Sequence, residues 1–545
     1  MKTIKGNLVD VDKNEIYPVI IKYDTKVRQI NRLNEPCDNF ILPGLIDAHI
    51  HIESTMLTPS RFAEVVIPHG TVATVSDPHE IANVAGVKGV KFMIHDSPRE
   101  MKLNYTAPSC VPATQFETSG AELDSKKVKQ LLKLKQVVAL GEVMNYPGVI
   151  NRDPELMRKI RFARLAGKRV DGHAPMLTGL NLDKYISAGI TTEHESTSYK
   201  EGLEKLRKGM KLMIRQGFSE HNMPDLIQLA RQYPDDCFIV SDDRHAPDLV
   251  RGHIDELLRQ AVALGLDPLI AVKCCTKNPS IHYGLNTGLI RVGLSADFVV
   301  VNDLCHFYVE QVIINGQLVA EKGECLVKFK QHNFPLRINY YPLRRDDFVI
   351  KADSDFVNAR VIGIIRRQII TKDLTMRLKV KNGLLMPDES KGVSYLAVVN
   401  RYKKTSPAMA LVKGLWVDGA IASSVSHDSH NIIVTGNDPD DMLKAVRLVM
   451  RHGGLAFASG KKSFVVPLEV AGLMTNKPLN KLLDELSTIK KMVRSADCAL
   501  ASPFMQLSFL ALLVIPELKL SDKGLFDAKR FCLIKPEQRF KEIND

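Results

Sequence analysis

The chain has 545 residues, of which 45% are hydrophobic and 25% charged, so it is long enough for two or three globular domains. Its net charge is +12, but only 6% of the residues are aromatic and no basic run alternates with aromatic residues, which argues against a nucleic-acid partner. No apolar run reaches the roughly 20 residues that a membrane-spanning helix needs, so no membrane partner is expected.

The cysteines indicate the compartment. There are nine of them, an odd number, and none occurs in a Cys-x-x-Cys pair. The first residues show no apolar segment of the kind that directs secretion. We therefore expect a reducing, cytoplasmic setting.

The two segments that flank residues 44–289 have the pattern of short strands. Residues 1–43 are too few to form a stable sheet alone, and residues 293–324 (GLSADFVVVNDLCHFYVEQVIINGQLVAEKGE) offer matching strands. The dipeptide Asn315–Gly316 in the second segment is a strong signal for a two-residue hairpin. We predict one small β domain built from residues 1–43 and 290–345.

Between these segments, strand and helix patterns alternate. Eight apolar strands are predicted, at residues 45–52, 71–76, 102–106, 137–144, 169–173, 190–195, 211–215 and 237–241. This repetition favours an α/β fold, a (β/α)8 barrel over residues 44–289. A doubly wound sheet would normally have a glycine-rich phosphate loop after its first strand, and none is present.

The pattern changes after the small β domain. Alternating strand-like segments occupy residues 348–400, and a helical pattern follows at residues 439–452. We predict a C-terminal α+β domain over residues 346–545.

The first barrel strand carries two histidines in ILPGLIDAHIHIEST, residues 41–55. His49 and His51 are two positions apart, so on a strand they point to the same face and can reach one point. Asp47 precedes them and Glu53 follows, which makes the carboxyl end of this strand polar. Alone, such a pair is weak evidence for a metal site.

Other predicted strands also end in polar residues, and in a barrel these ends meet on one face. Taken singly, a histidine there could be a core residue and Asp242 could cap a helix. Together they favour a metal site, because imidazole and carboxylate ligands suit Zn, Mn or Fe(II). The residues are Asp77, His79 and Glu80 after strand two, Glu142 on strand four, His173 on strand five, His194 on strand six, and Asp242, Asp243 and Arg244 after strand eight.

Several of these stretches resemble the amidohydrolase superfamily and, within it, the adenine deaminase family. The resemblance is carried by LPGLIDAHIHIEST, SDPHEIANVAG, SCVPATQFETSGA, GEVMNYPGVI, DGHAP, AGITTEHEST, SDDRHAPDL, GHIDELLRQAVALGLDP and GAIASSVSHDSHNIIVTG. It covers the chain up to about residue 475.

The resemblance implies a binuclear site with Mn(II) or Fe(II), and with Zn as a further option. His49 and His51 would bind one metal, His173 and His194 the second, Glu142 would bridge them, and Asp242 would be the strand-eight ligand. The bridging group in the superfamily is often a modified lysine, and Glu142 at that position fits the adenine deaminase branch.

The implied reaction is the hydrolytic deamination of adenine to hypoxanthine and ammonia by a metal-activated hydroxide, a step of purine salvage. Glu142 and Asp242 would be catalytic, with Asp242 as general base and then general acid. Asp243 and Arg244 would bind the substrate. The alternatives are a cyclic-amide hydrolase of the same superfamily and a non-catalytic barrel that only binds.

For two further sets of residues the sequence leaves several roles open. Asp77, His79 and Glu80 would bind an additional metal, orient the ligand histidines or contact the purine. The segment from His427 to His430 would reach the barrel mouth or stabilise a domain contact. The resemblance also implies a homo-oligomer, such as a dimer.

Overall fold

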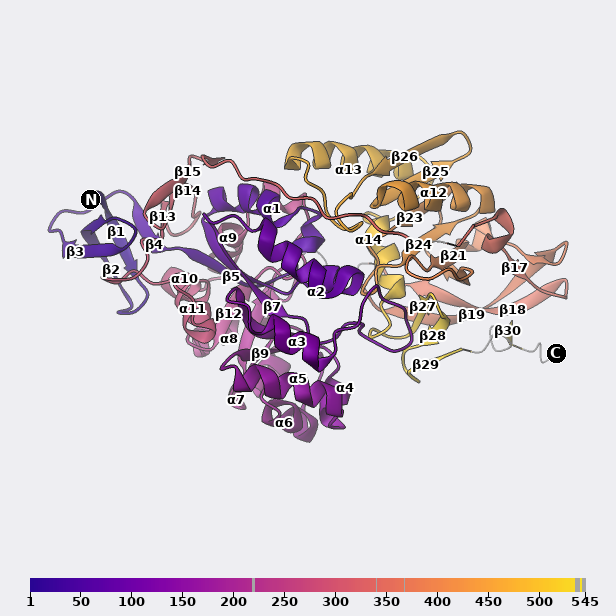
Figure 1. Ribbon diagram of the computed structural model, residues 1–545, viewed down its shortest axis with the longest axis horizontal. Coiled ribbons are helices and arrows are strands. Elements are labelled where there is room, and N and C mark those ends of the chain that lie inside the picture. The colour runs from indigo at the N-terminus through magenta and orange to yellow at the C-terminus, as the bar shows by residue number, and fades with distance from the viewer. Residues whose placement is uncertain (218–220, 340, 367, 535–539, 542–545) are drawn as a thin grey trace. The chain divides into compact units, whose positions relative to one another are not determined.

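The structure is a computed structural model that describes residues 1–217, 221–339, 341–366, 368–534 and 540–541. The chain divides into two units, shown as a ribbon in Figure 1. Unit 1 comprises Met1–His79, Val87–Cys110 and Leu123–His332, and unit 2 comprises Glu80–Gly86, Val111–Glu122 and Asn333–Asp545. The predicted boundaries of three domains stay a prediction, because the small β domain and the barrel both lie in unit 1.

Unit 1 contains eight parallel strands that follow one another in chain order. Five pair as one sheet and three as another, and a hydrogen bond from the amide of Thr191 to the carbonyl of Val170, 2.9 Å long, joins the two. A parallel bridge between Ile50 and Asp242 links the last strand to the first. The strands are β5 (Leu45–Ile50), β6 (Thr71–Ser76), β7 (Lys102–Ala107), β8 (Val137–Val143), β9 (Arg169–Gly172), β10 (Thr192–Glu193), β11 (Lys211–Arg215) and β12 (Cys237–Val240).

Helices connect these strands, which confirms the predicted α/β barrel. The strands read as apolar runs because both of their faces are covered, inside by side chains and outside by helices. The helices are α1 (Pro59–Val66), α2 (His79–Asp96), α3 (Ser125–Leu131), α4 (Tyr146–Ile150), α5 (Pro154–Leu165), α6 (Gly179–Ser187), α7 (Tyr199–Arg207), α8 (Met223–Gln232), α9 (Ile254–Ala263), α10 (Pro268–Cys274) and α11 (Lys277–Tyr283).

The sixth strand is shorter than the predicted residues 190–195. The reason is the side chain of Glu193, whose carboxylate accepts hydrogen bonds from the amides of Glu195 and Ser196 at 2.8 and 3.0 Å. These contacts turn the chain directly after the strand. His194 and Glu195 therefore lie directly after the carboxyl end of β10 rather than on the strand.

The segments on either side of the barrel form one sheet, and Figure 1 shows them side by side. The two-residue turn at Asn315 and Gly316 has φ angles of 49° and 73°, as the hairpin signal predicts. The strands, in sheet order, are β16 (Glu324–Cys325), β15 (Gln317–Glu321), β14 (Val309–Ile314), β13 (Phe298–Val301), β4 (Phe40–Pro43), β1 (Lys2–Asp10), β2 (Glu15–Tyr23) and β3 (Val27–Arg32).

Unit 2 is built on a second sheet, whose core is formed by Val, Ala, Ile and Leu side chains. Its central strands carry helix α12 (Pro439–His452), and α13 (Leu479–Arg494) and α14 (Pro503–Ser508) follow. The strands are β17 (Ile350–Lys351), β20 (Leu384–Leu385), β19 (Thr371–Lys381), β18 (Phe356–Ile364), β22 (Ala408–Lys413), β21 (Val393–Val399), β24 (Ile432–Gly436), β23 (Ala420–Ser423), β25 (Leu455–Ser459) and β26 (Lys462–Val466), with β30 (Phe540–Lys541) beside β18 and a small sheet of β27 (Leu518–Ser521), β28 (Gly524–Asp527) and β29 (Cys532–Leu533).

All nine cysteines lie at described positions, and none of them forms a disulfide. Burial raises the pKa of the Cys274 thiol to about 12, which makes it a packing residue rather than a nucleophile. Among the helices of the described residues, none has both the length and the apolar composition for crossing a membrane.

Candidate metal centre

The two histidines of the first strand face the same acid. His49 lies on β5 and His51 directly after it, and their rings are 5.0 Å apart. The Nε2 atoms of His49 and His51 lie 3.3 and 3.2 Å from Oδ1 of Asp242. Both imidazoles thus converge on the end of strand eight, as their spacing in the sequence predicts.

The carboxylate of Glu142 lies between two groups of histidines. Its Oε1 is 3.4 Å from Nε2 of His51 and 3.3 Å from Nδ1 of His79. Its Oε2 is 2.7 Å from Nδ1 of His173 and 3.2 Å from Nε2 of His194. Each oxygen serves a different group, which is the arrangement needed for one carboxylate to link two cations.

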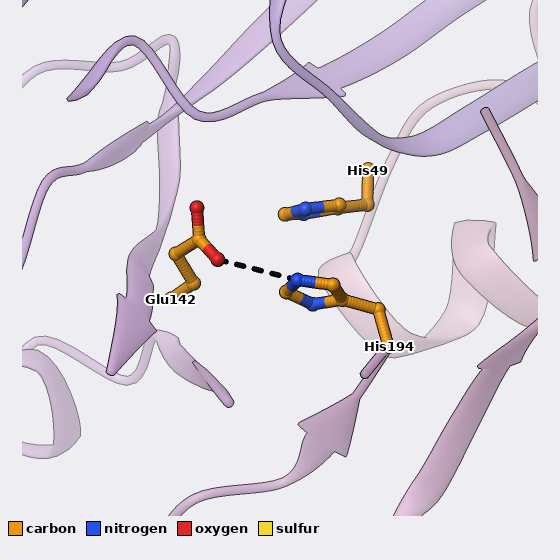
Figure 2. A group of neighbouring side chains, drawn as sticks. All are labelled: His49, Glu142 and His194. Atoms are coloured by element: carbon orange, nitrogen blue, oxygen red, sulfur yellow. Dashed lines mark ion pairs between the residues drawn. The ribbon is translucent and has the colours of Figure 1, made fainter. Parts of the chain in front are cut away.

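Figure 2 shows how closely two of these groups approach each other. The rings of His49 and His194 are stacked, with their centroids 4.1 Å apart, and the carboxylate of Glu142 faces the ring of His194. All three side chains are buried. Residues from strands one, four and six therefore meet at one point in the barrel.

The predicted residues form overlapping sets that can each hold a cation, since the ligand atoms of a set lie within 4.8 Å of one another. Such a mixture of imidazole and carboxylate suits Zn, Mn or Fe(II). The sets in unit 1 are His49, His51 and Asp242; His49, Glu142 and His194; His51, His79 and Glu142; and His173, His194 and Glu195.

The tautomer of His51 fits metal binding. Its Nδ1 lies 3.0 Å from the backbone carbonyl of Asp77, so Nδ1 donates its proton there and Nε2 is the nitrogen that faces the cluster and could bind a metal in place of a proton. The carboxylate of Asp77 accepts the amide of Glu142 at 2.9 Å. Asp77 thus orients the ring of His51 and holds the backbone of Glu142, without being in any of the cation sets.

The electrostatics of the cluster favour a cation. Burial raises the pKa of Glu142, but hydrogen bonds with His173 and His194 outweigh it and hold that pKa well below its usual range. Burial likewise lowers the pKa of His194, but hydrogen bonds to Glu142 and Glu195 raise it well above the usual value. Burial and the charge of Glu142 raise the pKa of Asp77 to about 7. The carboxylates thus attract positive charge to this point.

Asp242, two residues after the end of strand β12, has an unusual backbone conformation with φ at 55°. Aspartate and asparagine tolerate this left-handed region better than most residues. The next residue, Asp243, accepts a hydrogen bond of 2.6 Å from the hydroxyl of Ser54. Ser54 follows the first strand, so both acids are contacted by residues of strand one or of the segment directly after it.

Arg244 is 2% exposed and its guanidinium contacts the chain's own groups. It pairs with the carboxylate of Glu256 and donates to the carbonyl of Gly252 at 3.2 Å. A substrate-binding role for Arg244 stays a prediction, and these contacts do not favour it.

A buried contact between His253 and Asp47 lies beside the histidines of the first strand. Nε2 of His253 lies 3.0 Å from Oδ2 of Asp47, and both side chains are fully buried. The other oxygen, Oδ1 of Asp47, accepts the amides of His49 and Ser241 at 3.3 and 3.2 Å. Asp47 therefore ties the first strand to the last directly beside the cluster.

Two residues of the cluster were not predicted. Glu195 lies 3.5 Å from Nε2 of His194, and Arg215 donates to both Glu195 and Asp242. A usable signal existed for Arg215, since it is the one charged residue at the carboxyl end of strand seven, in KLMIR. Glu195 stands next to His194 in the sequence.

Glu80 belongs to unit 2, where it approaches His427 and His430. Its Oε2 is 3.4 Å from Nε2 of His430. Nδ1 of His430 accepts the amide of Ser426 at 3.2 Å, which places the ring proton on Nε2. In this tautomer Nε2 offers no lone pair to a metal, but Glu80, His427 and His430 form a further set that could hold a cation, so an additional metal at Glu80 stays a prediction.

Glu117 is a second buried acid of unit 2, and we expect Glu117→Gln to stabilise the protein at pH 8. Burial raises the pKa of Glu117 from 4.5 to about 7. The unfolded carboxyl ionises near pH 4.5 and the folded one near pH 7, so stability falls as the pH rises between these values. The loss is roughly 3 kcal/mol, since one pH unit of pKa is worth about 1.36 kcal/mol.

Glutamine avoids this loss and can still accept from Thr114. The thermal midpoint should rise by about 3–8 °C at pH 8 and stay unchanged at pH 4.5. Glu122→Gln, on the exposed part of the same segment, is the matched control. A Glu117→Gln variant that is less stable at pH 8 would contradict this account.

Comparison with known proteins places these observations in a family context. The amidohydrolase family matches residues 40–319, and the adenine deaminase C-terminal domain matches residues 368–532. An adenine deaminase of Sulfurovum sp. (strain NBC37-1) is 46% identical over 97% of this chain and 99% of its own. An adenine deaminase of Methanothermobacter thermautotrophicus is 45% identical over 97% of this chain and 98% of its own.

Solved structures are more distant. A β-aspartyl dipeptidase from Fervidobacterium islandicum AW-1 is 18% identical, with a TM-score of 0.44, over 61% of this chain and 99% of its own. An enamidase is 17% identical, also with a TM-score of 0.44, over 61% of this chain and 100% of its own.

Proposed function

The chain belongs to the adenine deaminase family of the amidohydrolase superfamily, and on this premise we propose that it hydrolyses adenine to hypoxanthine and ammonia. The observation that carries the proposal is near full-length identity of 40–46% to several adenine deaminases. The cluster at the carboxyl ends of the barrel strands supplies the side chains for such a reaction. Such a reaction would be a step of purine salvage.

The family implies a divalent metal, and we propose two ions per chain, Mn(II) or Fe(II), with Zn as a further option. His49, His51 and Asp242 would hold one ion, and His173 and His194 the other. Glu142 would link the two, because its oxygens face different histidines. When bound, the ions act as Lewis acids that make a water molecule acidic near neutral pH.

Asp242 would carry the proton of this reaction. Water adds to C6 of adenine while the C6=N1 double bond opens toward N1, and Asp242 takes a proton from that water as the C–O bond forms. The acid then gives this proton to the amino nitrogen, the C–N bond breaks and ammonia leaves, while the remaining proton of the water ends on N1 as the C6 carbonyl of hypoxanthine forms. The position of Asp242 beside both strand-one histidines supports this role.

Asp243 would recognise the purine. It is less buried than Asp242, and the hydroxyl of Ser54 holds one of its oxygens. The carboxylate can accept a hydrogen bond from a protonated ring nitrogen. In this proposal Asp243 binds the substrate and Asp242 transfers the proton.

The alternative of a cyclic-amide hydrolase is not favoured. The bridging position holds Glu142 rather than lysine, and relatives at 40–46% identity are adenine deaminases. A binding barrel without catalysis would not require six side chains that converge on one point. The cytoplasmic location, the homo-oligomer and the absence of nucleic-acid and membrane partners stay predictions from the sequence.

Purified protein supplied with Mn(II) or Fe(II) should convert adenine at about 1–10³ per second, in the usual range for enzymes. Loss of adenine absorbance and release of ammonia measure the rate, and metal analysis should find two ions per chain. Chelation should lower the rate at least about 100-fold, and added metal should restore it. Dihydroorotate and a hydantoin serve as comparison substrates.

The proposal fails if the fully metal-loaded protein releases no ammonia from adenine. Hydrolysis of a comparison substrate in the same preparation would establish the cyclic-amide alternative instead.

A further inference from the structure

Strand seven ends in one arginine that is buried within the barrel. Arg215 is the last residue of β11, is 4% exposed, and lies opposite Val240 on the neighbouring strand. Asp242 follows Val240 by two residues. A guanidinium is costly to bury unless carboxylates surround it, so its partners define its role.

Those partners are two acids of the cluster. Nη2 of Arg215 donates to Oε2 of Glu195 at 2.8 Å, and Nη1 donates to both Oε1 of Glu195 and Oδ2 of Asp242, the latter at 2.7 Å. The planar fork of arginine matches a carboxylate in this two-bond arrangement. Glu195 thus fixes the plane of the guanidinium, and the guanidinium fixes Asp242.

As a result, the two oxygens of Asp242 contact different partners. Oδ2 is held by Arg215, while Oδ1 stays 3.3 and 3.2 Å from the Nε2 atoms of His49 and His51. Without Arg215, the short side chain of Asp242 would be able to rotate away from His49 and His51. The backbone alone does not prevent this, since it fixes only the position of Cβ.

We propose that Arg215 is a positioning residue for Asp242, oriented in turn by Glu195. This inference rests on the proposed function, in which Asp242 carries the proton. Proton transfer needs donor and acceptor within about 2.6–3.2 Å, and a displacement of 1 Å can lower a rate about 100-fold. Arg215 therefore acts on turnover rather than on substrate affinity.

The test compares Arg215→Ala and Arg215→Lys in the metal-loaded full-length protein. Measured in excess metal, Arg215→Ala should lower kcat at least about 100-fold and leave KM within about threefold. Ethylguanidinium should restore kcat of Arg215→Ala at least about tenfold, because it can fill the vacated space between the two carboxylates. Arg215→Lys should stay at least about tenfold slow, because an ammonium lacks the planar fork.

Arg169→Ala is the matched control, since Arg169 begins a barrel strand and its Nε donates to the carbonyl of His282 at 3.0 Å. Its kcat should stay near that of the wild type, and ethylguanidinium should not change it. If Arg215→Ala is insoluble, the value for Arg215→Lys decides the question.

Three results would overturn the inference. The first is a kcat of the soluble Arg215→Ala variant within threefold of wild type, and the second is a lost rate that excess metal restores together with the metal content. The third is a kcat that ethylguanidinium does not raise. A crystal structure of Arg215→Ala or Arg215→Lys tests the position of Asp242 independently of the kinetics. Asp242 should turn away from His49 and His51, and unchanged contacts would contradict the proposal. A wild-type protein that is inactive on adenine would refute the proposed function. The crystal structures of the variants would still show whether Arg215 positions Asp242.

Discussion

Replacing Glu142 by glutamine should remove metal from the barrel and lower the turnover of adenine at least about 10³-fold. Loss of a group that merely supports a metal ligand already costs roughly 10–100-fold in metal affinity or activity, so loss of a shared ligand should cost more. Glutamine also turns one oxygen into an NH2 donor toward imidazole nitrogens that lie 2.7–3.4 Å away. Metal analysis and the ammonia assay measure the two effects.

Glu64→Gln is the matched control, because it makes the same chemical change on a carboxylate that is 42% exposed on α1. Its metal content and rate should equal those of the wild type. Turnover of Glu142→Gln within tenfold of the wild type at full metal content would remove Glu142 from the centre.

Replacing Asp242 by asparagine should separate metal binding from catalysis. Asparagine tolerates the φ of 55° at this position and keeps a side-chain oxygen, so much of the metal content should remain. It has no carboxylate to take and return a proton, and such a group contributes about 10²–10⁴-fold to a rate. We expect kcat to fall by at least about 10³-fold with little change in KM.

The neighbouring change Asp243→Asn provides the contrast. Because Asp243 is held by Ser54 and lies outside the cation sets, its replacement should raise KM more than it lowers kcat. Steady-state kinetics of both variants with measured metal content tests the assignment. Equal losses of kcat in the two variants would show that Asp242 has no special part in proton transfer.

The barrel was predictable from the sequence because two local patterns coincide. Buried parallel strands are nearly continuous apolar runs, and each of several runs ends in a polar residue, as His49, Glu142 and His173 do. The hairpin at Asn315 is equally local, since its positive φ angles select the residue pair. The shortened strand six was not predictable, because the side chain of Glu193 binds the backbone beyond it.

The candidate site was predictable only as a set of strand ends. The position of Glu80 shows the limit: it is adjacent to His79 in the sequence, yet it lies in unit 2 beside His430. Arg215 shows the converse, since its role depends on acids that follow two other strands, Glu195 and Asp242. No periodic pattern in the sequence indicates the contacts of Glu80 or of Arg215.

The sequence by itself determined the succession of strands and helices, the polar ends of the strands and the family to which the chain belongs. These features depend on local periodicity and on residue type at fixed spacing. Only the tertiary structure decided which oxygen of Glu142 faces which histidines, which nitrogen of His51 is left toward the cluster, and what Arg215 holds. Side-chain direction within a site depends on contacts between residues distant in the chain, and no local pattern encodes them.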